Sequence, residues 1–178
     1  MYDRMIQCTN IFYHSLIRSF KIRFYMNIKC VPFYELSLDE LYAIMVLRQE
    51  VFVVEQNCPF VDADGKDQLA WHFMVWDENN RLAAYTRLFG KNVYYEGYTS
   101  IGRVVTSSHA RGGGIGKILM QKSIEKTIEL FGNEPIKIGA QSYLKKFYQS
   151  LGFELTGHDY VEDGIDHTYM TLDFARVP

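Results

Sequence analysis

The sequence predicts an α/β protein of the mixed-sheet (α+β) kind, in which one central mixed β-sheet is flanked by helices. Of the 178 residues, 48% are hydrophobic, which is enough apolar material for one self-supporting core. Strand-like and helix-like segments follow one another in the order β-α-β-β-β-α-β-α-β-β. A glycine-rich segment lies where one of these strands gives way to a helix. We expect a single folded domain over residues 26–178.

Composition and charge exclude several classes of protein. The formal net charge is -2, which is unlike the basic surface of a nucleic-acid-binding protein. No uninterrupted apolar run approaches the roughly 18 residues of a membrane span. Three cysteines, Cys8, Cys30 and Cys58, are widely spaced and the histidines are scattered singly, so neither disulfides nor a metal site are indicated. We therefore expect a cytoplasmic protein that uses no metal and binds neither nucleic acid nor membrane.

Residues 1–25 differ in composition from the rest of the chain. They carry several basic residues and interleaved aromatic side chains, but a single acid, Asp3. The segment lacks the apolar region and small-residue cleavage site of a secretory signal, although a basic, acid-poor composition also occurs in transit peptides. We treat it as an N-terminal appendage. Its assignment stays open between a transit peptide, an upstream start codon and a segment that packs on the core.

A strand is expected over residues 27–33, and the first helix follows it. Ser37 and Glu40 have the spacing of a capping box, and Leu36 and Leu41 that of a hydrophobic staple. Apolar residues then recur at helical spacing as far as Phe52. This pattern predicts that the helix turns one apolar face toward the core.

The segment 57–66 is expected to be a loop. The three aspartates Asp62, Asp64 and Asp67 in and beside it suggest a calcium site, because calcium-binding loops carry closely spaced carboxylates. If Asp62 were the first ligand, however, the required glycine would fall on Asp67 and the closing glutamate on Phe73. The sequence therefore excludes an EF-hand here.

The remaining elements are separated by clear turn residues. Strands are expected over 71–76, 82–89, 100–106, 136–141, 153–156 and 168–174, and a short helix over 144–151. A helix of about four turns, ended by Gly132, follows the glycine-rich segment. The stripe expected to face inward on this helix is Gly116, Met120, Ile124, Thr127, Ile128 and Phe131.

The glycine-rich segment 111–117 carries the first chemical signal. Its four glycines let the backbone approach a ligand closely, and the N–H groups of the first helical turn attract anionic oxygens. The spacing matches neither a Walker A loop nor a dinucleotide-binding motif. The segment is therefore expected to hold a phosphate group, although glycine-rich turns also occur without a ligand.

Several motifs resemble the GNAT acyltransferase superfamily. Arg111-x-x-Gly114-x-Gly116 is similar to its pyrophosphate signature [Q/R]-x-x-G-x-[G/A], and it lies at the same strand-to-helix junction. Segment 147–153 resembles the family's motif F-Y-x-x-x-G-F. The resemblance extends to the ElaA-like branch through residues 47–59, Asp62-x-Asp64, 102–105 and Glu162-Asp163-Gly164-Ile165-x-His167.

This resemblance implies acetyl-CoA as the cofactor and an amine as acceptor, either a small molecule or a peptide. The backbone of the expected strand 100–106 would run along the pantetheine arm, and the glycine-rich turn would take the pyrophosphate. Gln141 stands where many members have an asparagine that reaches the pantetheine. The residues implied to bind acetyl-CoA are Val104, Val105, Thr106, Arg111, Gly112, Gly113, Gly114, Ile115, Gly116, Lys117, Gln141 and Tyr148.

The resemblance also implies the catalytic residues. Tyr148 would be the general acid that protonates the leaving CoA thiolate, although an ordinary phenol holds its proton about one to two pKa units too tightly. Glu55 is the first candidate for the general base and for a contact with the acceptor. His72 and Arg103 are further candidates for the acceptor side, and Arg103 could instead pair with Glu55 or Asp163. His72, Glu162, Asp163 and His167 are the other candidate bases.

The function expected from these residues is acetyl-CoA-dependent N-acetyltransfer by direct attack of an amine in a ternary complex. Cys58 lacks a nearby histidine in the sequence and is expected to pack rather than to act as a nucleophile. Three alternatives stay open. One is a non-catalytic acyl-CoA-binding sensor, and another is a homoserine-lactone-synthase-like acyltransferase, whose sequence Arg48-x-x-Val51-Phe52 resembles. The third is a binding module unrelated to CoA, which would lose nothing when Gly114 is replaced. No motif identifies the acceptor. No motif identifies the oligomeric state either, for which a homodimer stays open.

Overall fold

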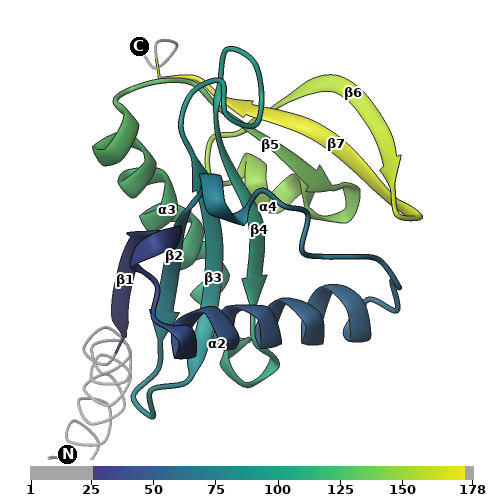
Figure 1. Ribbon diagram of the computed structural model, residues 1–178. Coiled ribbons are helices and arrows are strands. Elements are labelled where there is room, and N and C mark those ends of the chain that lie inside the picture. Colours follow the sequence, from purple (N-terminus) through teal and green to yellow (C-terminus); the bar gives the residue numbers. More distant parts are fainter. Residues whose placement is uncertain (1–25, 175–178) are drawn as a thin grey trace, which may run out of the picture.

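The computed structural model describes residues 26–174, so the N-terminal appendage and the last four residues lie outside it (Figure 1). Seven strands form one mixed sheet in the order β1-β2-β3-β4-β5-β7-β6. Within the described residues no helix is long and apolar enough to cross a membrane. The bounds are β1 Asn27–Pro32, α2 Leu38–Arg48, β2 Trp71–Trp76, β3 Leu82–Phe89, β4 Thr99–Thr106, α3 Ile115–Phe131, β5 Ile136–Gln141, α4 Lys145–Gln149, β6 Glu154–Glu162 and β7 Ile165–Leu172.

Helix α2 begins at the capping box that the sequence predicts. The backbone N–H of Glu40 donates to Ser37 Oγ at 3.1 Å, and the Glu40 carboxylate accepts from the Ser37 N–H at 2.9 Å. After Arg48 the helix widens into the π-helical segment Gln49–Glu55. Such segments are rare in proteins overall, but those that occur are often found at functional sites. Here the segment carries the chain from the core to the rim of a cavity described below.

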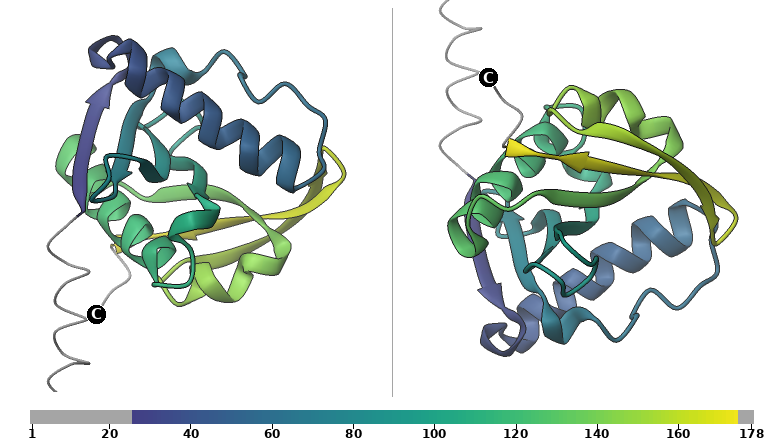
Figure 2. Two further views of the ribbon diagram at one scale, coloured as in Figure 1. Left: turned by 90° about the horizontal axis from the view of Figure 1, so that it is seen from below. Right: turned by 90° about the horizontal axis from the view of Figure 1, so that it is seen from above.

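The helices cover both faces of the sheet. Helix α2 packs on one face, and α3 and α4 pack on the other (Figures 1 and 2). The α2 face buries Ile44, Leu47, Val51, Met74, Leu82, Tyr85 and Val105. Large residues buried on the opposite face include Phe73, Leu88, Leu119, Met120, Ile136, Ile138, Tyr148, Phe153 and Met170. Strand β4, which borders the cavity, contributes to both layers of the core, with Val105 on the α2 face and Ile101 on the opposite face.

The inward stripe of α3 is rotated from the one expected. The buried residues of this helix are Ile115, Leu119, Met120, Ser123 and Thr127. The hydroxyl of Ser123 hydrogen-bonds to that of Thr86 on β3 at 2.8 Å, and the Thr127 hydroxyl donates to the Ser123 carbonyl at 2.7 Å. These bonds satisfy the buried hydroxyls, which is why polar residues can occupy the stripe.

Strands β4 and β5 part along most of their length, as Figure 1 shows. Their parallel pairing is confined to Thr99 with Ile136 and Ser100 with Lys137. Opposite β3, the strand β4 carries a β-bulge between Gly102 and Val105, and Arg103 within it has a positive φ of 48°. Beyond Ser100, the β5-facing edge of β4 therefore faces an opening instead of a neighbouring strand.

The last two strands are longer than expected and form a hairpin. The sequence predicts strands over 153–156 and 168–174, whereas β6 and β7 extend to Glu162 and from Ile165. Asp163 and Gly164 join them with φ values of 49° and 79°, as a tight hairpin turn requires. The extension carries the hairpin tip over the opening between β4 and β5.

Candidate active site

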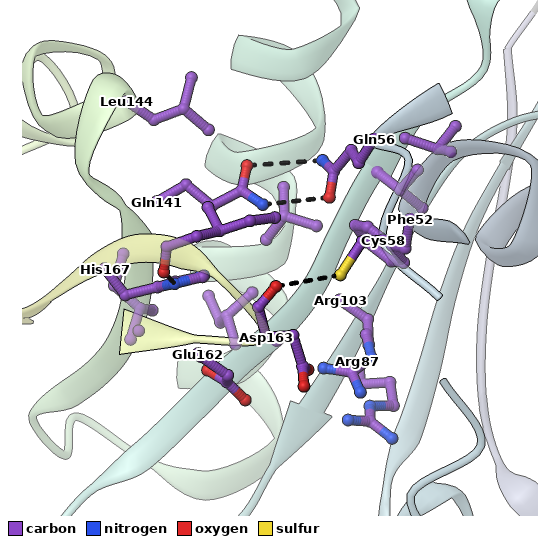
Figure 3. Close-up of a pocket in the computed structure, with 18 of the residues that line it drawn as sticks. Phe52, Gln56, Cys58, Arg87, Arg103, Gln141, Leu144, Glu162, Asp163 and His167 are labelled. Atoms are coloured by element: carbon purple, nitrogen blue, oxygen red, sulfur yellow. Dashed lines mark hydrogen bonds between the residues drawn. The ribbon is translucent and has the colours of Figure 1, made fainter. Parts of the chain in front are cut away.

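A cavity of about 390 Å³ occupies the opening between β4 and β5. The π-helical segment and the following loop form one side, β3 and β4 the floor, and β5, α4 and the hairpin tip the other side (Figure 3). Val104, Val105, Thr106, Arg111, Gln141 and Tyr148 line it, as do Glu55 and Arg103. The structure thus brings most of the sequence-predicted side chains to one cavity.

The glycine turn, residues 111–116, meets the mouth of this cavity at Arg111, the residue of the turn that lines it. Gly112 and Gly114 have φ values of 90° and 79°, which favour glycine, and a Cβ added at Gly112, Gly113 or Gly114 would meet nothing within 4 Å. Gly114 begins α3 and offers no side-chain cap to the first turn, in which the Lys117 N–H already donates to the Gly114 carbonyl at 3.0 Å. This geometry can hold a phosphate against the helix N-terminus.

Arg111 and Glu55 form a clasp across the mouth. The guanidinium donates to the two carboxylate oxygens at 2.5 and 2.9 Å and also to the carbonyl of Thr106. Hydrogen bonds from Arg111, together with its charge, lower the pKa of Glu55 below its ordinary value despite a small opposing effect of burial. A carboxylate held in this way is a weak base. The structure therefore disfavours the role of general base that the sequence assigns to Glu55.

Gln141 faces Gln56 across the cavity (Figure 3). The Gln141 Nε2 donates to Gln56 Oε1 at 3.2 Å, and the reciprocal contact measures 3.5 Å. Gln141 Oε1 also accepts a hydrogen bond from the Tyr143 hydroxyl at 2.6 Å. The amide expected to reach a pantetheine is thus positioned at the cavity and engaged with the chain's own polar groups.

Tyr148 belongs both to the core and to the cavity. Its ring packs edge-on against Phe147 and Phe153, with centroids 5.1 and 5.9 Å away, and only 5% of the residue is exposed. Burial, with a smaller contribution from Tyr143, raises the pKa of Tyr148. The phenol therefore keeps its proton at neutral pH. Burial also widens the gap in acidity between this phenol and a thiolate.

The floor of the cavity rests on a buried group of ion pairs. We call it the arginine–aspartate cluster; it comprises Arg48, Asp62, Asp64, Asp67, Arg87 and Arg103. Arg48, with a fully buried side chain, donates to Asp62 and Asp67, both at 2.6 Å. Arg87 donates to both oxygens of Asp64 at 2.7 and 2.8 Å. Three positive and three negative charges thereby compensate one another out of water.

Arg103 has other partners than expected. Instead of Glu55 or Asp163, it contacts Asp62 at 2.8 Å and Asp64 at 3.5 Å. Its guanidinium lies beside that of Arg87 at one end of the cavity (Figure 3). The expected pairing of Arg103 with Glu55 or Asp163 is therefore wrong, whereas its contact with an acceptor stays a prediction, since Arg103 lines the cavity.

His72 does not line the cavity, which corrects its assignment to the acceptor side. The residue is fully buried. Its Nδ1 is 2.7 Å from the Tyr85 hydroxyl, and its Nε2 is 3.0 Å from the Asp67 carbonyl. Since a carbonyl can only accept, Nε2 donates to it and Nδ1 accepts from Tyr85. Desolvation lowers the pKa of His72, so this histidine is a neutral structural residue.

The tip of the hairpin forms the β6–β7 wall, which consists of Tyr160, Glu162, Asp163, Ile165 and His167. The buried Cys58 thiol donates to the Asp163 carbonyl at 3.3 Å and ties this wall to the loop opposite. The Tyr160 ring stacks on His167, with centroids 5.4 Å apart. The sequence motif names Glu162, Asp163 and His167 but misses Tyr160.

Other cavity residues were also missed. Arg87, Tyr94 and Tyr95 line it without belonging to any motif, and Gln56 lines it although the motif over residues 47–59 gave it no role. One signal was available for the hairpin, because Asp163-Gly164 between apolar residues is typical of a two-residue β-turn. Among residues 26–174, no group of three His, Cys, Asp or Glu side chains is placed to hold a metal ion.

Comparisons with known proteins agree with this arrangement. The family model described as the acetyltransferase (GNAT) domain matches residues 62–174. The protein ElaA of Escherichia coli is 43% identical over 144 residues, which cover 80% of this chain and 93% of that protein. A UPF0039 protein of Synechocystis is 39% identical over 146 residues, with 82% and 92% covered.

Solved structures show the same fold. The crystal structure of an acyl-CoA N-acyltransferase from Pseudomonas aeruginosa superposes with a TM-score of 0.77 at 40% identity, covering 83% of this chain and 99% of that chain. The crystal structure of Escherichia coli ElaA gives a TM-score of 0.76 at 39% identity, with the same coverage. The parted strands, the glycine turn and these similarities lead to one conclusion: the chain belongs to the GNAT acetyltransferase family, in its ElaA-like branch.

Proposed function

We propose that the protein is an acetyl-CoA-dependent N-acetyltransferase in which an amine attacks the thioester directly in a ternary complex. One observation carries the proposal: the cavity between β4 and β5 is lined both by Arg111, the first residue of the exposed glycine turn, and by Tyr148. The similarity to the Pseudomonas acyl-CoA N-acyltransferase supports an acyl-CoA donor. The proposal includes a cytoplasmic location, in keeping with the free thiols of Cys30 and Cys58.

In this proposal the donor lies along the open edge of β4. The first-turn N–H groups of α3 and the side chain of Lys117 hold the pyrophosphate. The backbone of Val104, Val105 and Thr106 has no strand partner on its β5 side and can pair with the amide groups of the pantetheine. Gln141 offers a further amide once its contact with Gln56 opens.

Tyr148 is then placed to act on the sulfur. Its protonated phenol donates a hydrogen bond as negative charge grows on the leaving thiolate, and gives up its proton as the C–S bond breaks. A covalent acyl-enzyme is not required. The Cys58 thiol is buried and already donates to a backbone carbonyl, which supports a packing role.

Thermal unfolding with and without acetyl-CoA tests the binding half of the proposal. Saturation at about 100-fold over the Kd adds about 2.7 kcal/mol, which raises the Tm of a domain of this size by several degrees. Gly114→Glu places bulk and negative charge against the pyrophosphate, and we expect it to abolish the shift. Gly157→Glu is the matched control, because Gly157 also has a positive φ and open space around it. An unchanged shift in Gly114→Glu would refute the binding site.

Release of free thiol in the presence of a panel of amines tests the catalytic half. We expect Tyr148→Phe to lower turnover strongly while its Tm shift with acetyl-CoA is retained. A wild-type shift without thiol release for any amine would favour the sensor instead. Turnover with an acyl carrier protein as donor, but not with acetyl-CoA, would favour the homoserine-lactone-synthase-like alternative.

A further inference from the structure

The proposed reaction needs a base, because an amine is mostly protonated at neutral pH and cannot attack in that form. Two of the sequence-predicted candidates are occupied. Glu55 is held by Arg111 at the mouth, and both ring nitrogens of His72 are bonded away from the cavity. The remaining candidates, Glu162, Asp163 and His167, all lie on the β6–β7 wall.

His167 is the member of this wall whose protonation pattern the backbone fixes. Its Nδ1 lies 2.8 Å from the carbonyl oxygen of Ile165. A carbonyl only accepts, so Nδ1 carries the hydrogen. The neutral ring therefore has its lone pair on Nε2. Among the described residues, no protein group bonds to this second nitrogen.

The surrounding side chains hold the ring in this orientation. His167 lies opposite Gln141 in the register of β5 with β7, and opposite Tyr160 in that of β6 with β7. The Tyr160 ring stacks on it at an interplanar angle of 27°, and Tyr160 in turn stacks on Tyr169 with centroids 4.5 Å apart. Gly139 leaves room for this stack, because a Cβ there would collide with the Tyr160 hydroxyl.

We infer that Nε2 of His167 is the general base that deprotonates the acceptor amine; this inference rests on the proposed function. Nε2 takes one proton from the ammonium group, and the freed nitrogen forms a bond to the thioester carbon. The C–S bond breaks and the sulfur leaves with the proton of Tyr148. A second proton from the amine, passed through water, restores the Tyr148 phenol. The products are the amide, CoA as its thiol and one proton that His167 returns to solvent.

The tautomer itself can be measured on the wild-type protein without any acceptor. Long-range ¹H–¹⁵N correlation of the imidazole rings distinguishes the two neutral forms, and His167→Asn identifies the signal. We expect His167 to be protonated on Nδ1 and His72 on Nε2, so the two rings control for each other. A hydrogen on Nε2 of His167 would overturn the inference, whatever the activity of the protein.

The catalytic role is tested with His167→Asn. The asparagine amide can replace Nδ1 as a donor to the Ile165 carbonyl but supplies no base. With whichever of spermidine and lysine methyl ester wild type acetylates better, we expect turnover to fall by about 10²- to 10⁴-fold. The acetyl-CoA Tm shift should persist. His158→Asn, at an exposed position on β6, is the matched control and should act as wild type.

A second variant separates base catalysis from structure. In His167→Ala, added imidazole should restore part of the turnover, because it can occupy the space of the lost ring and accept the proton. Turnover of His167→Asn within a few-fold of wild type would refute the role, as would His167→Ala that folds but is not rescued. If wild type shows no Tm shift with acetyl-CoA or acetylates no amine, the proposed function fails. The tautomer of His167 can still be measured in that case, and it tests the geometry of the ring independently of activity.

Discussion

At the floor of the cavity, the arginine–aspartate cluster pairs nearly all of its polar atoms internally, whereas the β6–β7 wall leaves an imidazole nitrogen open. In the cluster the exception is Arg87 Nε, which is buried without a hydrogen-bond partner among the described residues. The contrast is sharpest between His72 and His167, since both donate to a backbone carbonyl but only His72 has its other nitrogen occupied.

This difference separates two uses of charged residues in one cavity. Charges taken out of water stabilise a fold only when they are mutually paired, and such pairs leave little free for a ligand. The half-buried imidazole of His167 is held in place by the hydrogen bond of one nitrogen, while its other nitrogen stays available to accept a proton. We therefore expect substitutions in the cluster to change stability first, and substitutions on the β6–β7 wall to change turnover first.

The largest effect is expected from Arg48→Met. The change removes a fully buried guanidinium and leaves Asp62 and Asp67 short of a counter-charge. Loss of one partner of a buried pair costs about 3–5 kcal/mol. At roughly 2–4 °C per kcal/mol, thermal unfolding should report a Tm lower by ten degrees or so.

An exposed ion pair provides the control for this prediction. Lys145 contacts Asp159 at 3.4 Å on the surface, where water screens the two charges, so Lys145→Met should leave the Tm nearly unchanged. Equal Tm values for Arg48→Met and wild type would break the comparison, because the cluster would then not be a stabilising element.

A smaller loss is expected from Gly139→Ala. The added methyl group would collide with the Tyr160 hydroxyl and push the stack away from His167. Overpacking of this kind costs about 1–3 kcal/mol. Gly113→Ala is the matched control, because its Cβ would meet nothing within 4 Å. Urea unfolding of both variants should show a lower midpoint for Gly139→Ala only, and a drop in both would assign the effect to glycine itself.

Much of the fold could be predicted because periodicity and caps act locally. The capping box at Ser37, the hairpin of β2 and β3 and the stop of α3 before Gly132 all depend on neighbours in sequence. The glycine turn was recognisable for the same reason: its chemistry depends on backbone freedom at consecutive positions.

The rest depends on contacts between distant residues. Ser123 is polar, and only the Thr86 hydroxyl, 37 residues away, explains its burial on α3. The aspartates of the loop 57–66 give no sign in the sequence that arginines of α2, β3 and β4 will meet them. The tautomer of His167 likewise depends on a carbonyl orientation that exists only in the folded hairpin.

Acid should weaken the cluster, which tests its ionic character. Burial alone would raise the pKa of Asp64, but hydrogen bonds and charge from Arg87, with help from Arg103, lower it well below its ordinary value. A carboxyl with a depressed folded-state pKa stabilises the fold above its unfolded pKa and loses that contribution as the pH falls. Stability should therefore decline from about pH 4 downward, less steeply in Asp64→Asn. Parallel pH profiles of the two proteins would contradict this.

The smallest effect is expected where the two regions meet. The Cys58 thiol bridges the loop of the cluster to the Asp163 carbonyl, and a thiol is a weak donor. Cys58→Ala should therefore lower the free energy of unfolding by about 1 kcal/mol or less. Cys30, half-buried on the other side of β2, gives a matched Cys30→Ala control that breaks no such bridge. Hydrogen exchange should then show faster exchange at the hairpin tip in Cys58→Ala and not in the control. An unchanged tip would mean that the β6–β7 wall is held by the Tyr160 stack alone, independently of the floor.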